Sequence, residues 1–329
     1  MFKEHRIVCV TPAGRRRYMR LLIPQILASA FVDRYDIWVN TTNASDIRFL
    51  EATAKLDSRI NLVAQPDGAV DGTKSIGAFH RLSMDEDTVY VRFDDDVVWI
   101  EPGFFERFLA FRIAHPEYLL TMPLIINNAI CTALLERTGR IRTSRPISMS
   151  AWDKIGWKDG RFAKSLHELF LKLAETGDWH RLKGGNYPIS LARFSINCIS
   201  WFGRDLAKHP QLIGWNEEED WTTTSAIATG RTNCITGDAI VAHYAFYPQR
   251  YEVDASNLLD RYELLLAGQQ DTAEILAKLD NAFPVSSDPE TEGGSKVSAP
   301  GLLDRLQIWS RPWRGREAIV SLPQPQQEL

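Results

Sequence analysis

The sequence has few cysteines, and those it has lack the spacing of a metal site. The four cysteines of the 329-residue chain are far apart and include no Cys-x-x-Cys pair. Structural zinc sites are usually built from such pairs, so the composition argues against one. Cys9 lies in an apolar run, where a buried free thiol is expected. The full set is Cys9, Cys131, Cys198 and Cys234, and its pattern favours a reducing compartment.

Long apolar runs and an excess of charge of one sign are also missing. No stretch reaches the ~20 apolar residues that span a bilayer, and no export signal precedes the first apolar run. The formal net charge of −4 provides no overall basic field that would attract nucleic acid. We therefore expect a cytoplasmic protein without a nucleic-acid partner. An acidic substrate would have to be bound by a local basic patch or by a metal.

The first hundred residues alternate short apolar runs with amphipathic stretches. This alternation is typical of βαβ units and predicts an α/β domain with a mixed, mainly parallel sheet flanked by helices. Ligands bind such sheets beyond the carboxyl ends of the strands. Thr11, Asn40 and Asp94 all lie at the ends of expected strands, so they are expected to line one crevice. The expected strands are residues 6–10, 35–40, 60–64 and 89–93.

Later segments differ in kind. Residues 193–201 are expected to form a strand, and residues 257–279 a helix with leucines on one face. Residues 284–300 are rich in Ser, Pro, Gly and Glu, which predicts a flexible linker. The tail at 301–329 carries leucines and tryptophans among arginines, which suggests contact with a membrane surface or a partner.

Three adjacent aspartates, Asp94, Asp95 and Asp96, follow the expected strand at 89–93. Carboxylates ~4 Å apart repel each other by about 1 kcal/mol in water and by more where water is scarce. A solvated acidic turn closing a hairpin would avoid this cost, but apolar runs on both sides favour a place near the core and a bound cation. Extended backbone would put Asp94 and Asp96 on one side, where their oxygens suit Mg²⁺ or Mn²⁺.

The segment from Val89 to Phe105 resembles the Asp-x-Asp region of glycosyltransferases with the GT-A fold. In that family a strand, the aspartates, a short apolar run and a Pro-Gly helix start follow in this order. The resemblance implies a Rossmann-like sheet, a Mn²⁺ or Mg²⁺ ion, and a nucleotide-diphosphate sugar as donor. Asp94 and Asp96 would bind the metal, and Asp94 and Asp95 would contact the donor.

The resemblance extends to other segments between residues 6 and 110. Residues 10–12 end the first expected strand, where members of the family hold the nucleotide base. Residues 72–82 are similar to a Gly-Lys stretch near the diphosphate. A solvated charge is the alternative for each cation there, but Lys74 precedes an expected helix start, where backbone N–H groups attract anions. The residues expected to contact the donor are Thr11, Pro12, Asn40, Lys74, Arg81, Asp94 and Asp95.

A second acidic cluster lies between Trp215 and Trp221. Acidic residues there suit a helix N-terminus. The resemblance implies instead that Asp220, with Glu219 as its rival, deprotonates the acceptor hydroxyl, as in inverting members of the family. His243 lies in an apolar run that suits a hydrogen-bonded core histidine, whereas the family places a late histidine as a third metal ligand.

The sequence thus predicts a metal-dependent, inverting glycosyltransferase that acts on a hydroxyl of a glycan or glycoconjugate. The tryptophans between residues 152 and 221 either stack on sugars or fill the core. The expected organisation is a GT-A catalytic domain at 1–283, with a nucleotide-sugar half at 1–125, an acceptor half at 126–250 and a helical extension at 251–283, then the linker at 284–300 and the tail at 301–329.

Three other functions are compatible with parts of the sequence. Residues 94–98 satisfy the Asp-x-Asp-x-Thr/Val pattern of haloacid-dehalogenase-type phosphohydrolases, with Asp94 as the nucleophile. That family carries the pattern on its first core strand, whereas three expected strands precede it here. A nucleotidyltransferase is poorly matched, because its Gly-rich N-terminal loop is absent. A non-catalytic carbohydrate-binding protein would use the tryptophans alone.

Overall fold

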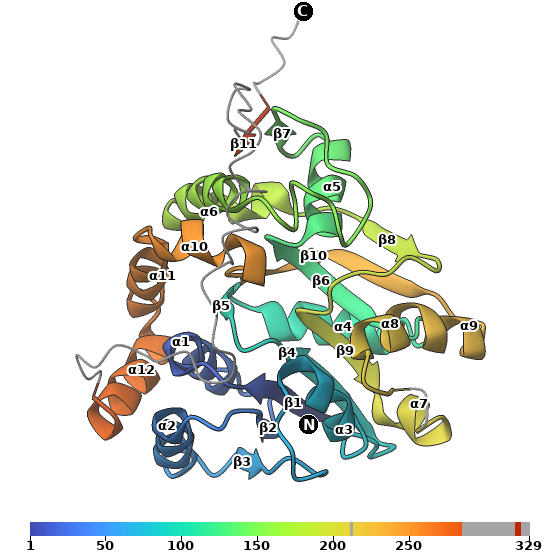
Figure 1. Ribbon diagram of the computed structural model, residues 1–329, viewed down its shortest axis with the longest axis vertical. Coiled ribbons are helices and arrows are strands. Elements are labelled where there is room, and N and C mark those ends of the chain that lie inside the picture. The colour runs from blue at the N-terminus through green and yellow to red at the C-terminus, as the bar shows by residue number, and fades with distance from the viewer. Residues whose placement is uncertain (211–212, 285–319, 324–329) are drawn as a thin grey trace, which may run out of the picture.

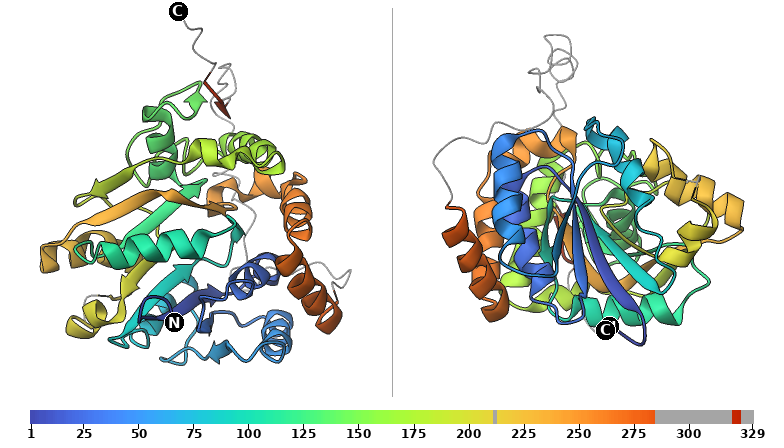
Figure 2. Two further views of the ribbon diagram at one scale, coloured as in Figure 1. Left: turned by 180° about the vertical axis from the view of Figure 1, so that it is seen from behind. Right: turned by 90° about the horizontal axis from the view of Figure 1, so that it is seen from below.

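The computed structural model describes residues 1–210, 213–284 and 320–323. In this part of the chain a central sheet is covered by helices on both sides (Figures 1 and 2). The expected linker and tail lie outside the described residues, except for Pro284 and the short segment 320–323. None of the helices described combines the length and apolarity that a membrane crossing requires.

The first half of the sheet is built as the apolar pattern predicts. Four parallel strands pair in the order β3-β2-β1-β4, which confirms the expected α/β arrangement. The strand β1 extends to Ala13, beyond its expected end at Val10, so Thr11 and Pro12 belong to a strand and not to a loop. The strands are β1 (Arg6–Ala13), β2 (Arg34–Val39), β3 (Ile60–Val63) and β4 (Thr88–Phe93). The helices between them are α1 (Arg16–Leu27), α2 (Ala44–Ala54), η1 (Gly72–Ser75) and α3 (Ile76–His80).

Beyond β4 the sheet becomes mixed. The nine strands are ordered β3-β2-β1-β4-β9-β6-β10-β5, and β8 pairs with β10. Strand β9 (Cys198–Phe202) is antiparallel to β4 and to β6 (Thr121–Ile126). Strand β10 (Asn233–His243) is parallel to β6 and antiparallel to β5 (Val97–Ile100) and β8 (Asn186–Ile189). The strand expected at 193–201 therefore begins later than predicted.

The helices of the second half surround this mixed region. The helix expected at 257–279 is two helices, α11 (Leu258–Ala267) and α12 (Gln270–Ala282). Arg20 fixes both to α1, because its Nη1 lies 2.8 Å from Glu263 Oε2 and its Nη2 lies 2.7 Å from Asp280 Oδ2. The other elements are α4 (Phe104–Ala114), α5 (Ala129–Arg137), β7 (Arg142–Thr143), α6 (Gly160–Glu175), η2 (Asp178–Leu182), α7 (Gly203–Lys208), α8 (Glu217–Glu219), η3 (Asp220–Thr224), α9 (Ser225–Thr229), η4 (Tyr247–Gln249), α10 (Arg250–Asp254) and β11 (Val320–Ser321), which pairs with β7.

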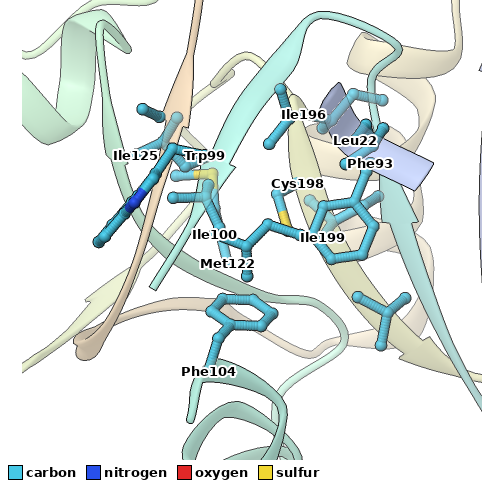
Figure 3. Close-up of a cluster of buried hydrophobic side chains, with 14 of the residues drawn as sticks. Leu22, Phe93, Trp99, Ile100, Phe104, Met122, Ile125, Ile196, Cys198 and Ile199 are labelled. Carbon is cyan, nitrogen blue, oxygen red and sulfur yellow. The ribbon is translucent and has the colours of Figure 1, made fainter. Parts of the chain in front are cut away.

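The core fills the space between the sheet and its helices. Figure 3 shows a part of it in which Phe93 of β4, Trp99 of β5, Phe104 of α4 and Cys198 of β9 lie together. All four cysteines are buried and free, as expected. Burial raises the pKa of the Cys131 thiol to about 12, which keeps it protonated at neutral pH.

Helix α1 lies over β5, the last strand in the order of the sheet. Gln25 Nε2 donates to Val98 O at 3.2 Å, and Ile100 N donates to Gln25 Oε1 at 2.6 Å. Pro24 lies inside α1 and does not end the helix. Gln25 Nε2 also donates to Leu21 O at 2.8 Å. These contacts hold α1 in place, with its first residues at the carboxyl end of β1.

Candidate active site

The three aspartates form the turn between β4 and β5. Val97 N donates to Asp94 O at 3.1 Å, which closes the turn. The two strands are far apart in the sheet, so the turn does not close a hairpin. Asp95 and Asp96 are only 6% and 3% exposed, so they are not part of a solvated acidic turn. The alternation of an extended strand does not apply to a turn, and it is Asp95 and Asp96, not Asp94 and Asp96, that share a partner.

That partner is Arg15, at the start of α1. Its Nη2 lies 3.0 Å from Asp96 Oδ2 and also contacts Asp95 Oδ1. Its Nε lies 3.1 Å from both Asp95 oxygens, and Gly14 N donates to Asp95 Oδ2 at 3.0 Å. Burial acts to lower the pKa of the Arg15 guanidinium, but the two aspartates outweigh it and the pKa lies above its ordinary value. Arg15 is thus a permanent positive charge inside the triplet.

Asp94 binds a second buried arginine. Arg92 Nη2 lies 2.8 Å from Asp94 Oδ1, and Asn197 Nδ2 donates to Asp94 Oδ2 at 3.1 Å. Arg92 also donates to both oxygens of Glu217, at 2.8 and 2.9 Å, and His80 Nε2 lies 3.0 Å from Glu217 Oε2. Burial raises the pKa of Asp94, and although Arg92 lowers it, the pKa stays above the ordinary value. This network connects the triplet to the second acidic cluster.

The other oxygen of Asp96 faces His243, the last residue of β10. The distance between His243 Nε2 and Asp96 Oδ1 is 3.4 Å. His243 Nδ1 donates to Asn127 O at 3.2 Å, which leaves Nε2 facing the carboxylate. Either a proton on Nε2 or a cation between the two atoms would join them. Ligands of one ion at about 2.1 Å and at a right angle are about 3 Å apart, so this pair fits a divalent cation.

The number of protein ligands agrees with an ion that also binds phosphate. Among the described residues, no group of three or more His, Cys, Asp or Glu side chains is arranged to hold a metal. Mg²⁺ in nucleotide sites uses one or two carboxylates, and substrate phosphates and water complete its coordination. Asp96 offers one such carboxylate, with His243 Nε2 beside it, and the roles of both as ligands stay predictions. Both oxygens of Asp94 already accept hydrogen bonds from protein groups, and its role as a ligand stays a prediction.

Three arginines lie around the triplet. Arg15 and Arg92 contact the aspartates directly, and Arg250 Nη2 lies 3.9 Å from Asp96 Oδ2. Burial acts to raise the pKa of Asp96, but Arg15, His243 and Arg250 lower it well below its ordinary value. Because Arg92 also pairs with Glu217, these three arginines serve four carboxylates. A diphosphate would add negative charge, which a divalent cation would neutralise.

The second acidic cluster lies at the start of a helix, which was one of the two alternatives predicted for it. The helix is α8, and it passes into the π-helical turn η3. Single π-helical turns within helices are frequent at functional sites. The four carboxylates of this cluster differ in their partners, and Glu217 is the one held in the Arg92 network.

Within this cluster, the pKa of Glu218 is raised, and the charge of Asp94 is one of the causes. Burial raises the pKa of Glu218, Arg193 lowers it, and the nearby charge of Asp94 raises it again, with a net upward shift. Arg193 Nε lies 2.7 Å from Glu218 Oε1. A carboxyl with a raised pKa beside other charged groups is a candidate general base. The sequence offered no signal for Glu218, because its burial among four adjacent acidic residues depends on the fold.

Asp220 and Glu219, the residues predicted from the sequence, have other partners. Asp220 Oδ2 accepts a hydrogen bond from Gly214 N at 2.8 Å. Glu219 Oε2 lies 3.1 Å from Arg193 Nη1, and its Oε1 accepts a hydrogen bond from Thr223 Oγ1 at 2.6 Å. Glu219 thus shares Arg193 with Glu218, whereas Asp220 is bonded to the backbone of Gly214. Their assignment as the base stays a prediction.

The predicted contacts to the nucleotide base lie at the ends of β1 and β2. Pro12 is buried, and Thr11 is fully buried with its hydroxyl accepting a hydrogen bond from Tyr35 Oη at 3.0 Å. Thr11 therefore contributes to the core. Asn40 Nδ2 donates to Gly72 O at 3.0 Å, and Ser75 Oγ donates to Asn40 Oδ1 at 2.8 Å. Asn40 thus ties the end of β2 to the segment that carries Lys74.

The two predicted phosphate contacts are exposed and paired with acidic residues. The side chain of Lys74 is 67% exposed, and its Nζ lies 3.5 Å from Asp71 Oδ2. Arg81 is 49% exposed and pairs with Asp67. The structure does not bring either cation to the aspartate triplet by a direct contact, and their roles stay predictions. The arginines that do reach the triplet are Arg15, Arg92 and Arg250.

The tryptophans separate into core and surface residues. Trp201 and Trp221 are 0% and 1% exposed and belong to the core, whereas Trp152 and Trp215 are 53% and 72% exposed. The guanidinium carbon of Arg193 lies 4.9 Å from the centre of the Trp152 ring. Because Arg193 also binds Glu218, an exposed aromatic ring lies next to the second acidic cluster.

Comparisons with known proteins give only distant similarities. No family model matches the sequence, and no curated protein matches it. The structure is similar to Staphylococcus aureus TarS 1-349, with a TM-score of 0.42, 12% identity, and coverage of 84% of this chain and 71% of that one. It is similar to GalNAc-T7 with UDP, GalNAc and Mn²⁺, with a TM-score of 0.46, 11% identity, and coverage of 89% and 53%.

A third similar structure is glucosyl-3-phosphoglycerate synthase from Mycobacterium tuberculosis in complex with Mn²⁺, UDP and glucosyl-3-phosphoglycerate. Its TM-score is 0.43 at 12% identity, with coverage of 80% of this chain and 79% of that one. Because these similarities are low, the roles of the site residues rest on the contacts within the site.

Proposed function

We propose that this chain is a glycosyltransferase that moves a sugar from a nucleotide-diphosphate donor to an acceptor hydroxyl, with the help of a divalent cation. The observation that carries the proposal is the pair formed by Asp96 Oδ1 and His243 Nε2, which face each other at 3.4 Å beside a buried acidic turn. The resemblance of residues 89–105 to an Asp-x-Asp region supports it. Phosphate oxygens of the donor would complete the coordination.

Asp96 and His243 would hold the cation, Mn²⁺ or Mg²⁺. When bound, it would neutralise the charge that develops on the leaving diphosphate. Asp94 and Asp95, at the end of the same strand, would face the donor, as the resemblance implies. Arg250 lies at the same carboxylate as the cation, with Nη2 3.9 Å from Asp96 Oδ2. It is therefore placed to donate to a phosphate oxygen.

Glu218 is our candidate for the general base. The acceptor hydroxyl would donate its proton to the Glu218 carboxylate while its oxygen attacks the anomeric carbon and the bond to the diphosphate breaks. Attack on the face opposite the diphosphate inverts the anomeric configuration. Burial and the charge of Asp94 raise the pKa of Glu218, which strengthens it as a base. Asp220 and Glu219 are the rival candidates for this step.

The acceptor is proposed to be a sugar of a glycan or glycoconjugate. Exposed aromatic rings bind the apolar faces of sugars, and carboxylates and amides bind their hydroxyls. Trp152 is linked to Glu218 through Arg193, and Trp215 lies immediately before the acidic helix. Trp152 is therefore linked to the candidate base by contacts, and Trp215 is close to it in sequence.

The phosphohydrolase alternative is not favoured. Its nucleophile would be Asp94, but both oxygens of Asp94 accept hydrogen bonds, from Arg92 and Asn197. The triplet also follows the fourth strand of the chain, not the first. A non-catalytic sugar-binding protein would have no need for a buried turn with three carboxylates, because burying charge is costly.

The test is a panel of UDP- and GDP-sugars with Mn²⁺, scored by thermal shift and by release of the nucleotide. A ligand that binds the native state raises its melting temperature. We expect one donor to be turned over, and Asp96→Ala to lose this activity. Asp271→Ala, at an exposed position on α12, is the matched control and should keep it. Full activity in Asp96→Ala would overturn the metal site.

A further inference from the structure

Arg15 occupies an unusual position for a side chain next to a metal site. Its guanidinium contacts Asp95 and Asp96 together, while the second oxygen of Asp96 faces His243. Its side chain is 20% exposed, so most of it is enclosed by the protein. The proposed metal ligand Asp96 therefore already has a cationic partner within the protein.

One nitrogen of Arg15 lacks a partner. Arg15 Nη1 is buried, and no group in the described part of the chain accepts a hydrogen bond from it. A buried N–H group without an acceptor is costly, and the cost is larger for a charged group. Arg250 Nε is in the same situation, at the other side of Asp96 Oδ2. Two cationic side chains at the triplet thus have free donors, which an anion would satisfy.

The position of Arg15 also opposes a lone divalent cation. Arg15 Nη2 lies 3.0 Å from Asp96 Oδ2, so a dication bound to Asp96 would have a permanent positive charge as its neighbour. Like charges this close repel strongly where water is scarce. A diphosphate removes the obstacle, because it brings the negative charge that both cations need.

We propose that Arg15 is a built-in cation that keeps divalent metal out of the Asp96–His243 pair until a diphosphate arrives, and then donates its free N–H to that diphosphate. Metal and nucleotide therefore bind together and not separately. The inference rests on the proposed function, since it assumes that Asp96 and His243 bind a metal.

The test uses Mn²⁺ alone as the probe, measured by calorimetry and by thermal shift on the full chain. Wild type should bind Mn²⁺ weakly. Arg15→Gln should bind it at least tenfold more tightly, because the competing charge is gone. Without metal, Arg15→Gln should melt below wild type, since Asp95 and Asp96 lose their partner, and Mn²⁺ should restore most of the loss. If Arg15 had only a structural role, Arg15→Gln would lower the melting temperature and Mn²⁺ would not restore it.

Matched variants keep the result specific. Arg17→Gln removes a neighbouring arginine whose Nη2 lies 2.9 Å from Asp254 Oδ2, and it should show no rescue by Mn²⁺. Arg15→Gln combined with His243→Ala should lose the tight binding. Should Arg15→Gln fail to fold without metal, Arg15→Lys provides the second measurement. It keeps the charge but loses the forked contact, and its Mn²⁺ affinity should rise about threefold.

Two results would overturn the inference in different ways. Equal Mn²⁺ affinity in wild type and Arg15→Gln would end the role of Arg15 but leave the proposed function standing. The titration is repeated with UDP or GDP present to test whether metal and nucleotide bind together. Wild type should then bind Mn²⁺ at least tenfold more tightly than without nucleotide. Absence of Mn²⁺ binding under every condition would end both the inference and the metal-dependent function.

Discussion

One buried guanidinium joins the two acidic clusters: Arg92 Nη1 lies 2.8 Å from Glu217 Oε2, and Arg92 Nη2 lies 2.8 Å from Asp94 Oδ1. Arg92 is 2% exposed, so these contacts are shielded from water. They fix the start of α8, and with it Glu218, relative to the aspartate turn. The donor side and the acceptor side of the proposed site are thus held in one network.

Breaking this network should be costly. In Glu217→Ala, Arg92 would lose one of its two acidic partners and His80 its hydrogen bond. Removal of one partner of a buried ion pair lowers the free energy of unfolding by about 3–5 kcal/mol. Urea unfolding measures it. Glu263→Ala, which removes a 41% exposed partner of Arg20, is the control and should cost at most about 1 kcal/mol. Equal losses in both variants would contradict the buried network.

The cost of Glu217→Ala should depend on pH. Burial acts to raise the pKa of Glu217, but Arg92 and His80 lower it below its ordinary value. A carboxyl whose folded-state pKa is depressed stabilises the fold fully above the unfolded pKa, about 4.3 for Glu, and loses this contribution as the pH falls through the folded value. The difference between wild type and Glu217→Ala should therefore be largest at neutral pH and shrink below about pH 4.

Glu218→Gln separates the candidates for the base. Loss of a general base lowers kcat by about 10²–10⁴. Asp220→Asn should lower it by less, because Asp220 is engaged with Gly214 N. Because the pKa of Glu218 is raised, the acid limb of kcat/KM should lie above about 4.3, the ordinary value for Glu. A large loss in Asp220→Asn with an active Glu218→Gln would return the role to Asp220.

Glu218→Gln should also stabilise the protein at high pH. A carboxyl with a raised folded-state pKa costs stability fully above that pKa, because its charge is buried, and costs nothing below the unfolded pKa. The melting temperature of Glu218→Gln should exceed that of wild type at neutral pH, and the gain should vanish below about pH 4. A lower melting temperature at neutral pH would show that Glu218 is a structural partner of Arg193.

Gly77→Ala should disturb the segment that precedes the acidic helix. A Cβ atom at Gly77 would lie 1.8 Å from Gly214 O. This is much shorter than a van der Waals contact, so the Gly214 backbone would have to move. Because Gly214 N is bonded to Asp220, the shift would reach α8. We expect a loss of about 1–3 kcal/mol in stability and a lower rate of transfer. Gly185→Ala, where a Cβ meets nothing within 4 Å, should change neither.

Trp152→Ala tests the acceptor side. Stacking of an aromatic ring is worth about 0.5–1.5 kcal/mol beyond the area it buries, which corresponds to a rise of about two- to tenfold in KM for the acceptor. Hydrolysis of the donor without an acceptor should not change. Trp152 contacts Arg193, and the ion-pair partners of Arg193 are Glu218 and Glu219, not the aspartates of the triplet. Tyr251→Ala, at an 85% exposed ring on α10, is the control. An unchanged KM in Trp152→Ala would remove this ring from the acceptor site.

The parallel half of the fold could be predicted because its signals are local. Each of β1 to β4 contains a short apolar run, and β1 and β4 are buried along almost their whole length. The break near Gly268 was missed because leucines continue the helical spacing into α11 and α12 on either side of it. The start of β9 was misplaced for a similar reason, since residues 193–197 are apolar in part but do not pair.

The site could be predicted in position but not in its contacts. The place of the aspartates after β4 follows from sequence, but their partners are distant: Arg15 is 80 residues from Asp95, and Glu217 is 137 residues from His80. No periodicity encodes such pairs. The prediction that Asp94 and Asp96 point to one side assumed the alternating side chains of an extended strand, and the aspartates form a turn instead. The surroundings that raise the pKa of Glu218 and lower that of Glu217 exist only in the folded chain.

The side-chain amide of Gln25 affects whether the sheet can pair with the sheet of a second chain. An unpaired edge strand offers free N–H and C=O groups to the edge of another sheet, and such pairing leads to aggregation. Gln25 accepts from Ile100 N and donates to Val98 O, so a single side chain replaces the strand that would otherwise lie beside β5. Helix α1 therefore protects the sheet against adding a strand from a second molecule at this edge.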